Sequence, residues 1–412
     1  MPGLKTLQRV CVAAAVGLLC GAGALAQSSP YYVGVAQSLD HESNLFRIGG
    51  GVSLPANAQS KSDTLSTTSL VAGVDQTWGR QRLTGSGSLR ATRFSSNDHL
   101  NNEGYGFNLG LDWATIERVS GRLAVSSDRS LRGYDPAYNG GVATKNIEDN
   151  NLLSGTVRVG VVTRLTAEAS ASRRHVRFSS PAYASAEYDQ TTGSLGLRYR
   201  LGGATTAGLA WRQSSVKPVL GADPFKRRDI DLTANWVPSG LSTVYARLSH
   251  SSTDHSRLPA RDFSGFTGEL LANTQATGKI KLGARVAREL GQSSYDFVGL
   301  DALLRPQRLT EEFNRVGTSL RFTADYELSA KIAMNASVDH VRRNFDGTQF
   351  ASAGDDRTTS LALGARWLPT RAIQVGCNVS HAKRSVNNVG LAPVGNNFAS
   401  TGFGCSGQFI FQ

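Results

Sequence analysis

Basic side chains recur at alternate positions through most of this sequence, between apolar neighbours. Arg198 and Arg200, for example, interleave with Leu195, Leu197 and Tyr199. Guanidinium groups in rows can hold carboxylates and phosphates through paired hydrogen bonds, so side chains of this kind are candidates for binding anions. Fifteen cations share such a position: Arg82, Arg90, Arg122, Arg158, Arg174, Arg198, Arg200, Arg212, Arg247, Lys279, Lys281, Arg285, Arg315, Arg321 and Arg366.

Fewer acidic residues share the same alternating positions. They are Asp112, Glu168, Asp231, Asp325 and Asp339. Each acid could pair with a neighbouring cation and brace the structure, and for any single arginine this role is an alternative to anion binding. Because the cations outnumber the acids in this set, we expect positive charge to remain after pairing and to favour anionic solutes.

Signals for catalysis are weak. His250 and His255 lie with Asp254 in the segment HSSTDHS, but this spacing matches no metal site. The Gly-Ser-Gly sequence around Ser86 lies inside a strand pattern, whereas a nucleophile elbow needs a strand-to-helix turn. We therefore expect no enzymatic activity, no metal and no cofactor. Stacking aromatic residues on a basic face are missing, so we also expect no nucleic-acid partner.

The elements that position the cations must place every second side chain on one face, and β-strands do so. In GYGFNLGLDWA, residues 104 to 114, aromatic and aliphatic side chains alternate with small, polar or charged ones. The same period of two recurs in eighteen segments, which we read as strands. The apolar face would contact lipid and the polar face would line a lumen.

Short turns and long polar connections alternate strictly between these segments, which is typical of an outer-membrane barrel. The long connections are expected at 40 to 64, 94 to 103, 128 to 150, 178 to 190, 214 to 228, 251 to 262, 290 to 312, 344 to 357 and 385 to 398. We therefore predict an all-β fold, a transmembrane antiparallel up-and-down β-barrel of about 18 strands. The predicted location is the outer membrane of a Gram-negative bacterium, with both termini in the periplasm.

Six aromatic residues occupy the last apolar position of a strand before a short turn: Trp78, Trp113, Tyr199, Trp236, Tyr326 and Trp367. Indole and phenol rings prefer the boundary between membrane and water. Packing in a core is the alternative, and the shared position favours an interfacial girdle on the periplasmic side.

The N-terminal segment is organised like a secretory signal peptide. Lys5 and Arg9 precede a short apolar run, and an Ala-Leu-Ala sequence ends the segment at Ala26. We expect a signal peptide at 1–26 and a barrel domain at 27–412. The whole chain has 44 Lys and Arg, so the mature domain keeps 42 cations against 32 acids, a charge of +10.

Two of the four cysteines, Cys11 and Cys20, leave with the signal peptide. Cys377 and Cys405 remain and have matching parity on the last two strands. A hairpin folded about Leu391 would put them directly opposite each other, where a cross-strand disulfide can form. Two reduced thiols facing lipid are the alternative.

Two short motifs carry a family resemblance. DHESNLFR at 40–47 leaves the first strand and LDW at 111–113 closes the fourth. With the strand pattern of the whole mature chain, they resemble the β-barrel porin family that includes EpsL-type exopolysaccharide export proteins. The resemblance implies a large outer-membrane barrel that works with an anionic polysaccharide and a periplasmic polysaccharide export protein. Outer-membrane lipid and the barrel-assembly machinery are the other expected partners. Barrel chains usually end on an aromatic residue that serves as an assembly signal. Here Gln412 ends the chain, but Phe409 and Phe411 keep the alternation.

The sequence thus predicts an outer-membrane channel that exports an acidic exopolysaccharide or capsule polymer. Many weak arginine sites along the lumen would let such a chain slide. An anion-preferring general diffusion porin is the alternative. The segment 290 to 312 is a candidate plug of the lumen.

Overall fold

A computed structural model describes residues 29–116, 118–134, 141–220, 222–300, 306–347, 353–389 and 396–411. The expected signal peptide at 1–26 lies outside the described residues. Within them, no helix is long and apolar enough to cross a membrane. Short 3-10 helices occupy three of the connections, η1 (Asp98–Leu100), η2 (Pro181–Ala186) and η3 (Pro259–Arg261).

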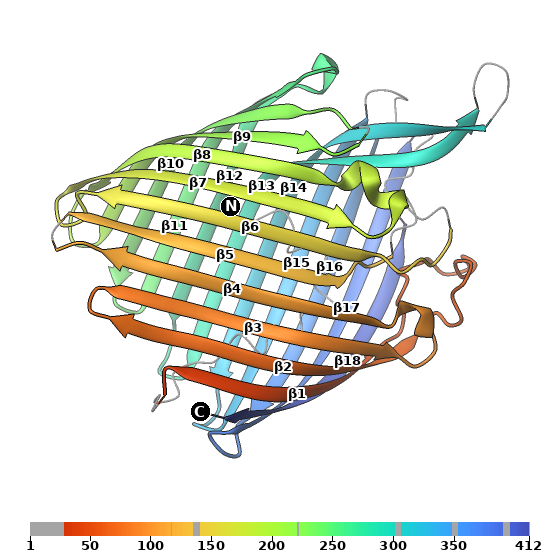
Figure 1. The fold of residues 1–412 in the computed structure, drawn as a ribbon, viewed down its shortest axis with the longest axis horizontal. Coiled ribbons are helices and arrows are strands. Elements are labelled where there is room, and N and C mark those ends of the chain that lie inside the picture. Colours follow the sequence, from red (N-terminus) through yellow and green to blue (C-terminus); the bar gives the residue numbers. More distant parts are fainter. Residues whose placement is uncertain are drawn as a thin grey trace.

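Eighteen antiparallel strands form one closed barrel (Figure 1), as the alternating sequence predicts. The strands are β1 (Tyr31–Glu42), β2 (Asp63–Trp78), β3 (Gln81–Phe94), β4 (Asn102–Ala114), β5 (Val119–Leu131), β6 (Ile147–Val159), β7 (Leu165–Phe178), β8 (Tyr188–Arg200), β9 (Thr205–Pro218), β10 (Phe225–Ser239), β11 (Ser242–His255), β12 (Phe263–Gln275), β13 (Ile280–Leu300), β14 (Pro306–Glu327), β15 (Ile332–Gly347), β16 (Ala353–Trp367), β17 (Ile373–Val389) and β18 (Phe398–Phe411). Each strand pairs with its sequence neighbours, so the topology is up-and-down.

The barrel closes between its first and last strands. β1 and β18 pair antiparallel, from Val33 opposite Phe411 to Glu42 opposite Gly402. Closure leaves no sheet edge with unpaired backbone groups, which is the condition for a β-structure to span hydrocarbon.

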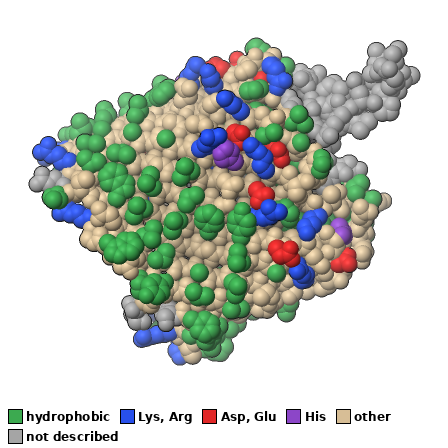
Figure 2. All heavy atoms as spheres, in the orientation of Figure 1, with side chains coloured by type: hydrophobic (Ala, Val, Ile, Leu, Met, Phe, Trp, Pro, Cys, Tyr) green, Lys and Arg blue, Asp and Glu red, His purple; other side chains and the backbone are tan. Residues whose placement is uncertain are grey.

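Alternation sets the two faces of the wall. Leu89, Leu195 and Phe266 lie at outward positions and are each more than 60% exposed. Figure 2 shows the outward apolar side chains gathered over the middle of the barrel. Acidic and histidine side chains gather toward the end with the long connections, whereas Lys and Arg side chains lie toward both ends. A band of apolar side chains therefore surrounds the barrel between its two rims.

The turns at one rim are short because their residues allow tight reversals. Gly79 has φ +59° between β2 and β3, a conformation that costs glycine little. Gly160, with φ +87°, begins the turn between β6 and β7. The long connections lie at the other rim, which we call the loop rim.

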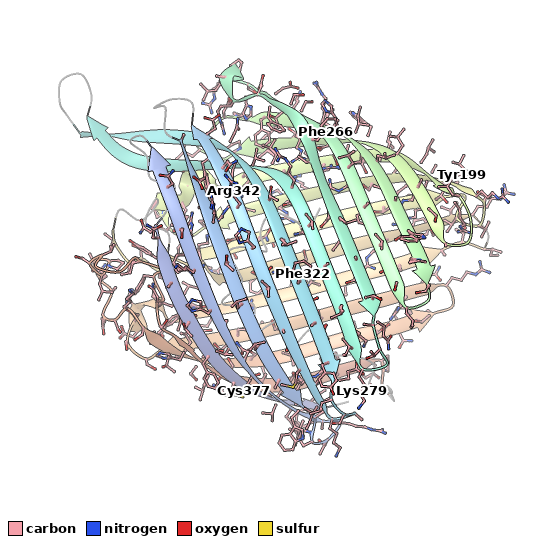
Figure 3. The ribbon with its side chains drawn as sticks, turned by 180° about the vertical axis from the view of Figure 1, so that it is seen from behind. Tyr199, Phe266, Lys279, Phe322, Arg342 and Cys377 are labelled. Carbon is pink, nitrogen blue, oxygen red and sulfur yellow. A yellow bond between two sulfur atoms is a disulfide. The ribbon has the colours of Figure 1, made fainter. Side chains whose placement is uncertain are left out.

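The strands extend further toward the loop rim than the apolar pattern predicts. β1 reaches Glu42, and β2 begins at Asp63. The largest difference is the segment 290 to 312, expected as a long connection and a candidate plug. Its described parts instead continue β13 and β14 as a paired hairpin that projects beyond the rim (Figures 1 and 3). Backbone pairing continues past the apolar band, where outward side chains become polar and the hydrophobic alternation ends.

Candidate functional site in the barrel lumen

Strand alternation directs most of the expected cations into the lumen. Fourteen of the fifteen occupy strand positions opposite in parity to the exposed apolar side chains. Lys279 is the exception, because it lies in the short turn between β12 and β13, at the lower rim in Figure 3. Its Nζ donates to the carbonyl oxygen of Leu328 in the neighbouring turn at 3.3 Å, so its assignment to the lumen wall was wrong.

At least ten of these fourteen cations are ion-paired with other described residues. The pairs are Arg82 with Asp75, Arg90 with Asp128, Arg122 with Asp112, Arg158 and Arg198 with Glu168, Arg212 with Asp229 and Asp231, Arg247 with Asp231 and Glu269, Lys281 with Glu327, Arg285 with Glu269 and Glu289, and Arg321 with Asp339. More acids face inward than the sequence analysis counted, for example Asp75, Asp229 and Glu269. The lumen is therefore closer to charge balance than the composition of the chain suggests.

In most of these pairs the guanidinium is more exposed than the carboxylate. The side chain of Arg198 is 47% exposed and that of Glu168 is 19% exposed. For Arg82 and Asp75 the values are 56% and 33%. The same order holds for Arg122–Asp112, Arg158–Glu168, Arg285–Glu269, Arg321–Asp339, Arg343–Asp356 and Arg384–Asp356, and it is reversed in Arg90–Asp128 and Arg247–Glu269.

Side-chain length explains this order. A carboxylate on a short stem stays close to the wall, whereas the longer arginine lays its stem along the wall and keeps its head in water. Even where the charges balance, a solute in the lumen therefore meets guanidinium groups first.

One group of charges is nearly sealed from solvent. We call it the buried knot: Arg212, Arg227, Asp229, Asp231, Ser249 and Ser251, on β9, β10 and β11. Arg212 binds Asp231 with two hydrogen bonds, Nε at 2.8 Å and Nη2 at 2.9 Å, and its Nη1 lies 3.0 Å from Asp229. Arg227 also pairs with Asp229, at 2.8 Å. The side chain of Asp229 is 0% exposed, so these charges are satisfied by one another rather than by water.

Hydroxyl groups and a neighbouring backbone complete the buried knot. Ser251 donates to Asp229, and Ser249 donates to Asp231. Arg227 donates from Nη1 to the carbonyl oxygen of Leu290 on β13 at 3.3 Å. The knot thereby ties β9–β11 to β13 near the loop rim, and we expect its main role to be structural.

A second group of pairs is open to solvent. We call it the open wall: Asp75, Arg82, Asp112 and Arg122, on the inward faces of β2–β5. Arg82 Nε donates to Asp75 at 2.7 Å, and Arg122 Nη1 donates to Asp112 at 2.9 Å. A cavity of about 410 Å³ beside the open wall is lined by Asp75 and Arg122, by polar residues such as Ser126, and by apolar residues such as Leu152.

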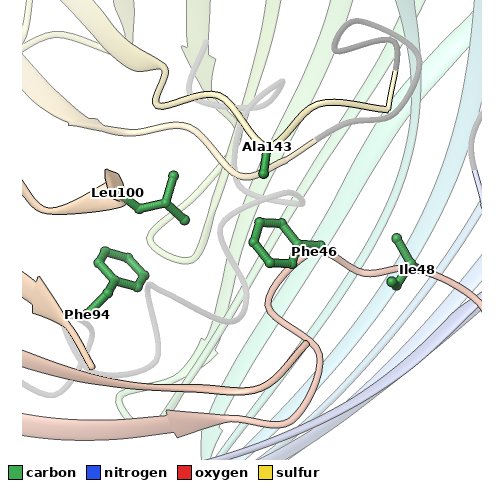
Figure 4. Packing of buried hydrophobic residues seen from close by; sticks show 5 residues of the cluster. All are labelled: Phe46, Ile48, Phe94, Leu100 and Ala143. Carbon is green, nitrogen blue, oxygen red and sulfur yellow. The ribbon is translucent and has the colours of Figure 1, made fainter. Parts of the chain in front are cut away.

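Three connections at the loop rim pack together through an apolar cluster. Phe46, Ile48, Phe94, Leu100 and Ala143 are its buried members, each at most 6% exposed (Figure 4). The cluster joins the connections that follow β1, β3 and β5. Because it contains the motif DHESNLFR through Phe46, that motif has a structural role at the mouth of the barrel.

A further connection crosses part of the mouth. η2, between β7 and β8, lies against β13, although four strands separate β8 from β13 around the barrel. Tyr183 of η2 is only 1% exposed. The mouth at the loop rim is therefore narrower than the barrel.

Asp63 anchors two of the rim connections. Its carboxylate accepts hydrogen bonds from the backbone N–H groups of Ser95, Ser96 and Asn97 and from Asn97 Nδ2, at 2.8 to 3.0 Å. Asp63 lies beyond the apolar band, which begins at Leu70 on this strand. Burial raises the pKa of Asp63, but the hydrogen bonds, led by those from Asn97, outweigh burial and hold the pKa below its usual range.

The remaining expected residues lie on the outer face. Cys377 and Cys405 are directly opposite each other on β17 and β18 and form a disulfide. The six aromatic residues of the expected girdle point outward near the short-turn rim: Trp78, Trp113, Tyr199, Trp236, Tyr326 and Trp367.

The histidines of HSSTDHS do not converge on a site. His250 points outward against Phe266, with ring centroids 5.3 Å apart. His255 takes the opposite parity and bonds Asp262 at 3.1 Å, whereas Asp254 pairs with Arg228 at 3.0 Å. Among the described residues, no cluster of His, Cys, Asp and Glu could hold a metal ion.

Sequence reasoning missed several inward charges near the loop rim. Arg227 belongs to the buried knot, and Arg343 and Arg384 both pair with the fully buried Asp356. These residues fell outside the expected strands, because the apolar alternation ends before the strands do. Continuing the parity of each strand past its last apolar residue would have found them.

No family model matches the sequence, and no curated protein matches it. Solved structures with a similar arrangement include the outer membrane protein OpdK from Pseudomonas aeruginosa, with a TM-score of 0.49 and 13% identity over 92% of this chain and 99% of that chain. OccK2 (OpdF) from the same organism, crystallised with glucuronate, has a TM-score of 0.48 and 10% identity over 93% and 98% of the two chains. The FrpB iron transporter from Neisseria meningitidis has a TM-score of 0.44 and 9% identity over 93% and 82%. Because these TM-scores are below 0.5, we infer no function for this chain from these structures.

Proposed function

We propose that this protein is an outer-membrane channel through which small anionic solutes diffuse passively. The apolar outer band and the closed barrel suit a membrane, and the inward face supplies a polar path through it. The observation that carries the anion preference is the greater exposure of guanidinium than of carboxylate in most lumen ion pairs, as in Arg198 and Glu168.

The proposed orientation follows the two rims. Short turns face the periplasm in barrels of this kind and long connections face the cell exterior, which puts both chain ends in the periplasm. The aromatic residues near the short-turn rim would then lie at the periplasmic boundary of the bilayer.

In this proposal, an anionic solute crosses the lumen by exchanging one guanidinium contact for the next. A solute carboxylate displaces water at one exposed guanidinium, such as Arg122, and moves on to the next, because each contact lies in water and is weak. The intramolecular partner, here Asp112, pairs with the guanidinium again after the solute leaves. Sites of this strength speed entry without trapping the solute.

The wild-type channel provides the test. The purified barrel is inserted into a planar bilayer, and the reversal potential is measured across a KCl gradient. We expect a steady open conductance with chloride more permeant than potassium, and a smaller selectivity at high salt because screening weakens exposed charges. A cation-selective channel would contradict the proposal.

Export of an acidic exopolysaccharide is the second candidate. The family resemblance of DHESNLFR and LDW favours it, and guanidinium groups along the lumen would hold a polymer as they hold a small anion. Such an exporter would stay closed in the bilayer until its periplasmic export protein docks on the short turns. A channel that conducts steadily on its own favours diffusion, and one that opens only with the export protein favours export.

A further inference from the structure

A group of basic side chains lies outside the barrel, just beyond the apolar band at the loop rim. We call it the collar: Arg173, His175 and Arg177 on β7, Lys217 on β9, and Lys226 and Arg228 on β10. All six take the outward parity of the exposed side chains Leu165, Trp211 and Ile230 on the same strands. They form one continuous surface, because Arg173 is opposite Thr191, Thr191 is opposite Ser215, and Ser215 is opposite Lys226.

The collar has more positive charge than its neighbours neutralise. Asp189 accepts from Arg177 at 2.7 Å and from His175 at 2.6 Å, and Arg228 pairs with Asp254. Burial raises the pKa of Asp189, but its hydrogen bonds from Arg177 and His175 outweigh burial and keep that pKa below the usual range. Asp189 is therefore ionised at neutral pH, and its charge is already used within the collar.

Three collar cations have no such partner. Arg173, Lys217 and Lys226 are exposed and make no hydrogen bond or ion pair with any residue that the structure describes. Elsewhere on the outer wall Arg93, by contrast, pairs with Glu103 at 2.7 Å. The three unpaired charges leave the collar complementary to an anion from outside the chain.

The position of the collar identifies the class of anion. Directly below it, on β8, β9 and β10, lie Leu195, Trp211 and Ile230, which are 61%, 47% and 55% exposed. From β7 to β10 the collar crosses three strand spacings, about 14 Å. A ligand that meets both surfaces carries phosphate groups on the collar and acyl chains on the apolar band.

The opposite side of the barrel is different at the same height. There outward histidines bond threonines on the neighbouring strand, His41 with Thr64 at 3.0 Å and His381 with Thr401 at 2.9 Å. Two exposed outward cations also lie on that side, Arg342 on β15 and Lys383 on β17. The collar differs from them by bringing six basic side chains together on β7, β9 and β10.

We propose that the collar binds the phosphate groups of a multiply phosphorylated lipid in the outer leaflet, whose acyl chains cover the apolar band on β8–β10. The site rests on the proposed placement in the outer membrane, with the loop rim outward. It is separate from the lumen, because collar and lumen side chains lie on opposite faces of the same strands.

The test measures lipid binding to the folded barrel in detergent. The probes are diphosphoryl lipid A, the same lipid with its phosphates removed, and inorganic phosphate, and the readout is the shift in the thermal unfolding midpoint. The variant Arg173→Gln/Lys217→Gln/Lys226→Gln removes the three unpaired cations. The control Arg93→Gln/Arg342→Gln/Lys383→Gln removes the same total charge from outward positions elsewhere on the rim.

We expect only the diphosphoryl lipid to raise the midpoint of the wild type. The collar variant should bind it about tenfold more weakly or worse, while the control variant keeps wild-type binding. Equal binding by collar variant and control would overturn the proposal, as would an equal shift from the dephosphorylated lipid or from inorganic phosphate. The ion selectivity of the collar variant should be unchanged, so a failure here is distinguishable from a failure of the channel proposal.

Discussion

The buried knot and the open wall are two sets of ion pairs that face the same lumen with similar geometry. Arg212 lies 3.0 Å from Asp229, and Arg122 lies 2.9 Å from Asp112. Their exposure differs greatly, since the side chains of the first pair are 9% and 0% exposed and those of the second are 50% and 43% exposed. An arginine and an aspartate at nearly the same distance therefore form a structural site in one place and a site that solutes can reach in another.

Burial separates the two roles. Charges removed from water need all their hydrogen bonds met, and the buried knot meets them with serines, a backbone carbonyl and a shared carboxylate. Charges left in water need no such support and stay free to exchange partners. The surroundings of the two groups differ accordingly. The buried knot is bonded to β13 through the carbonyl oxygen of Leu290, whereas the open wall borders a cavity.

The largest expected effect is on the stability of the buried knot. Asp229→Ala leaves Arg212 and Arg227 buried without the carboxylate that they share, and we expect it to lower the free energy of unfolding by about 3–5 kcal/mol. Urea unfolding in lipid vesicles, followed by tryptophan fluorescence, measures this change.

The matched control is Asp112→Ala, which breaks an exposed pair at nearly the same distance. Its expected cost is about 0–1 kcal/mol, because water solvates the guanidinium of Arg122 that is left behind. Similar losses in the two variants would show that burial does not separate the two groups.

A smaller effect tests a carboxylate held without any cation. Asp63 is bound by N–H groups alone, so its low pKa means that its stabilisation is present at neutral pH and is lost as the pH falls through and below about 4. Hydrogen exchange at the amides of Ser95, Ser96 and Asn97, corrected for intrinsic rates, should show protection at pH 6 that declines at pH 3.

The variant Asp63→Asn separates the carboxylate from the rest of the rim. It should reduce protection of these amides by about 1–2 kcal/mol at pH 6 and remove most of the pH dependence. A pH dependence that survives in the variant would mean that another group controls the connections at the rim.

Much of the fold could be predicted from the sequence because the two faces of each strand meet different solvents. In GYGFNLGLDWA, lipid selects Phe107, Leu109 and Trp113 while the lumen accepts Asn108 and Asp112, so parity alone gives the strands and their number. The ends of the strands could not be predicted in this way. Beyond the apolar band both faces contact water, and hydrogen bonds extend the strands without a hydrophobic pattern.

The candidate site was predictable only in part, for a related reason. Parity identifies the inward face of Arg122 and Arg212 equally well. It does not show that Arg227 reaches Leu290 from three strands away or that η2 lies against β13, because these contacts join distant segments. Exposure therefore had to come from the structure.

The central claim is that exposed guanidinium groups give the lumen its preference for anions. The variant Arg82→Gln/Arg122→Gln/Arg198→Gln removes three of them, and Arg93→Gln removes an outward arginine that is ion-paired like them. We expect the chloride-to-potassium permeability ratio from reversal potentials in a KCl gradient to fall about fivefold in the triple variant, or ~1 kcal/mol, and to stay unchanged in the control. An unchanged ratio in a folded, conducting triple variant would contradict the account.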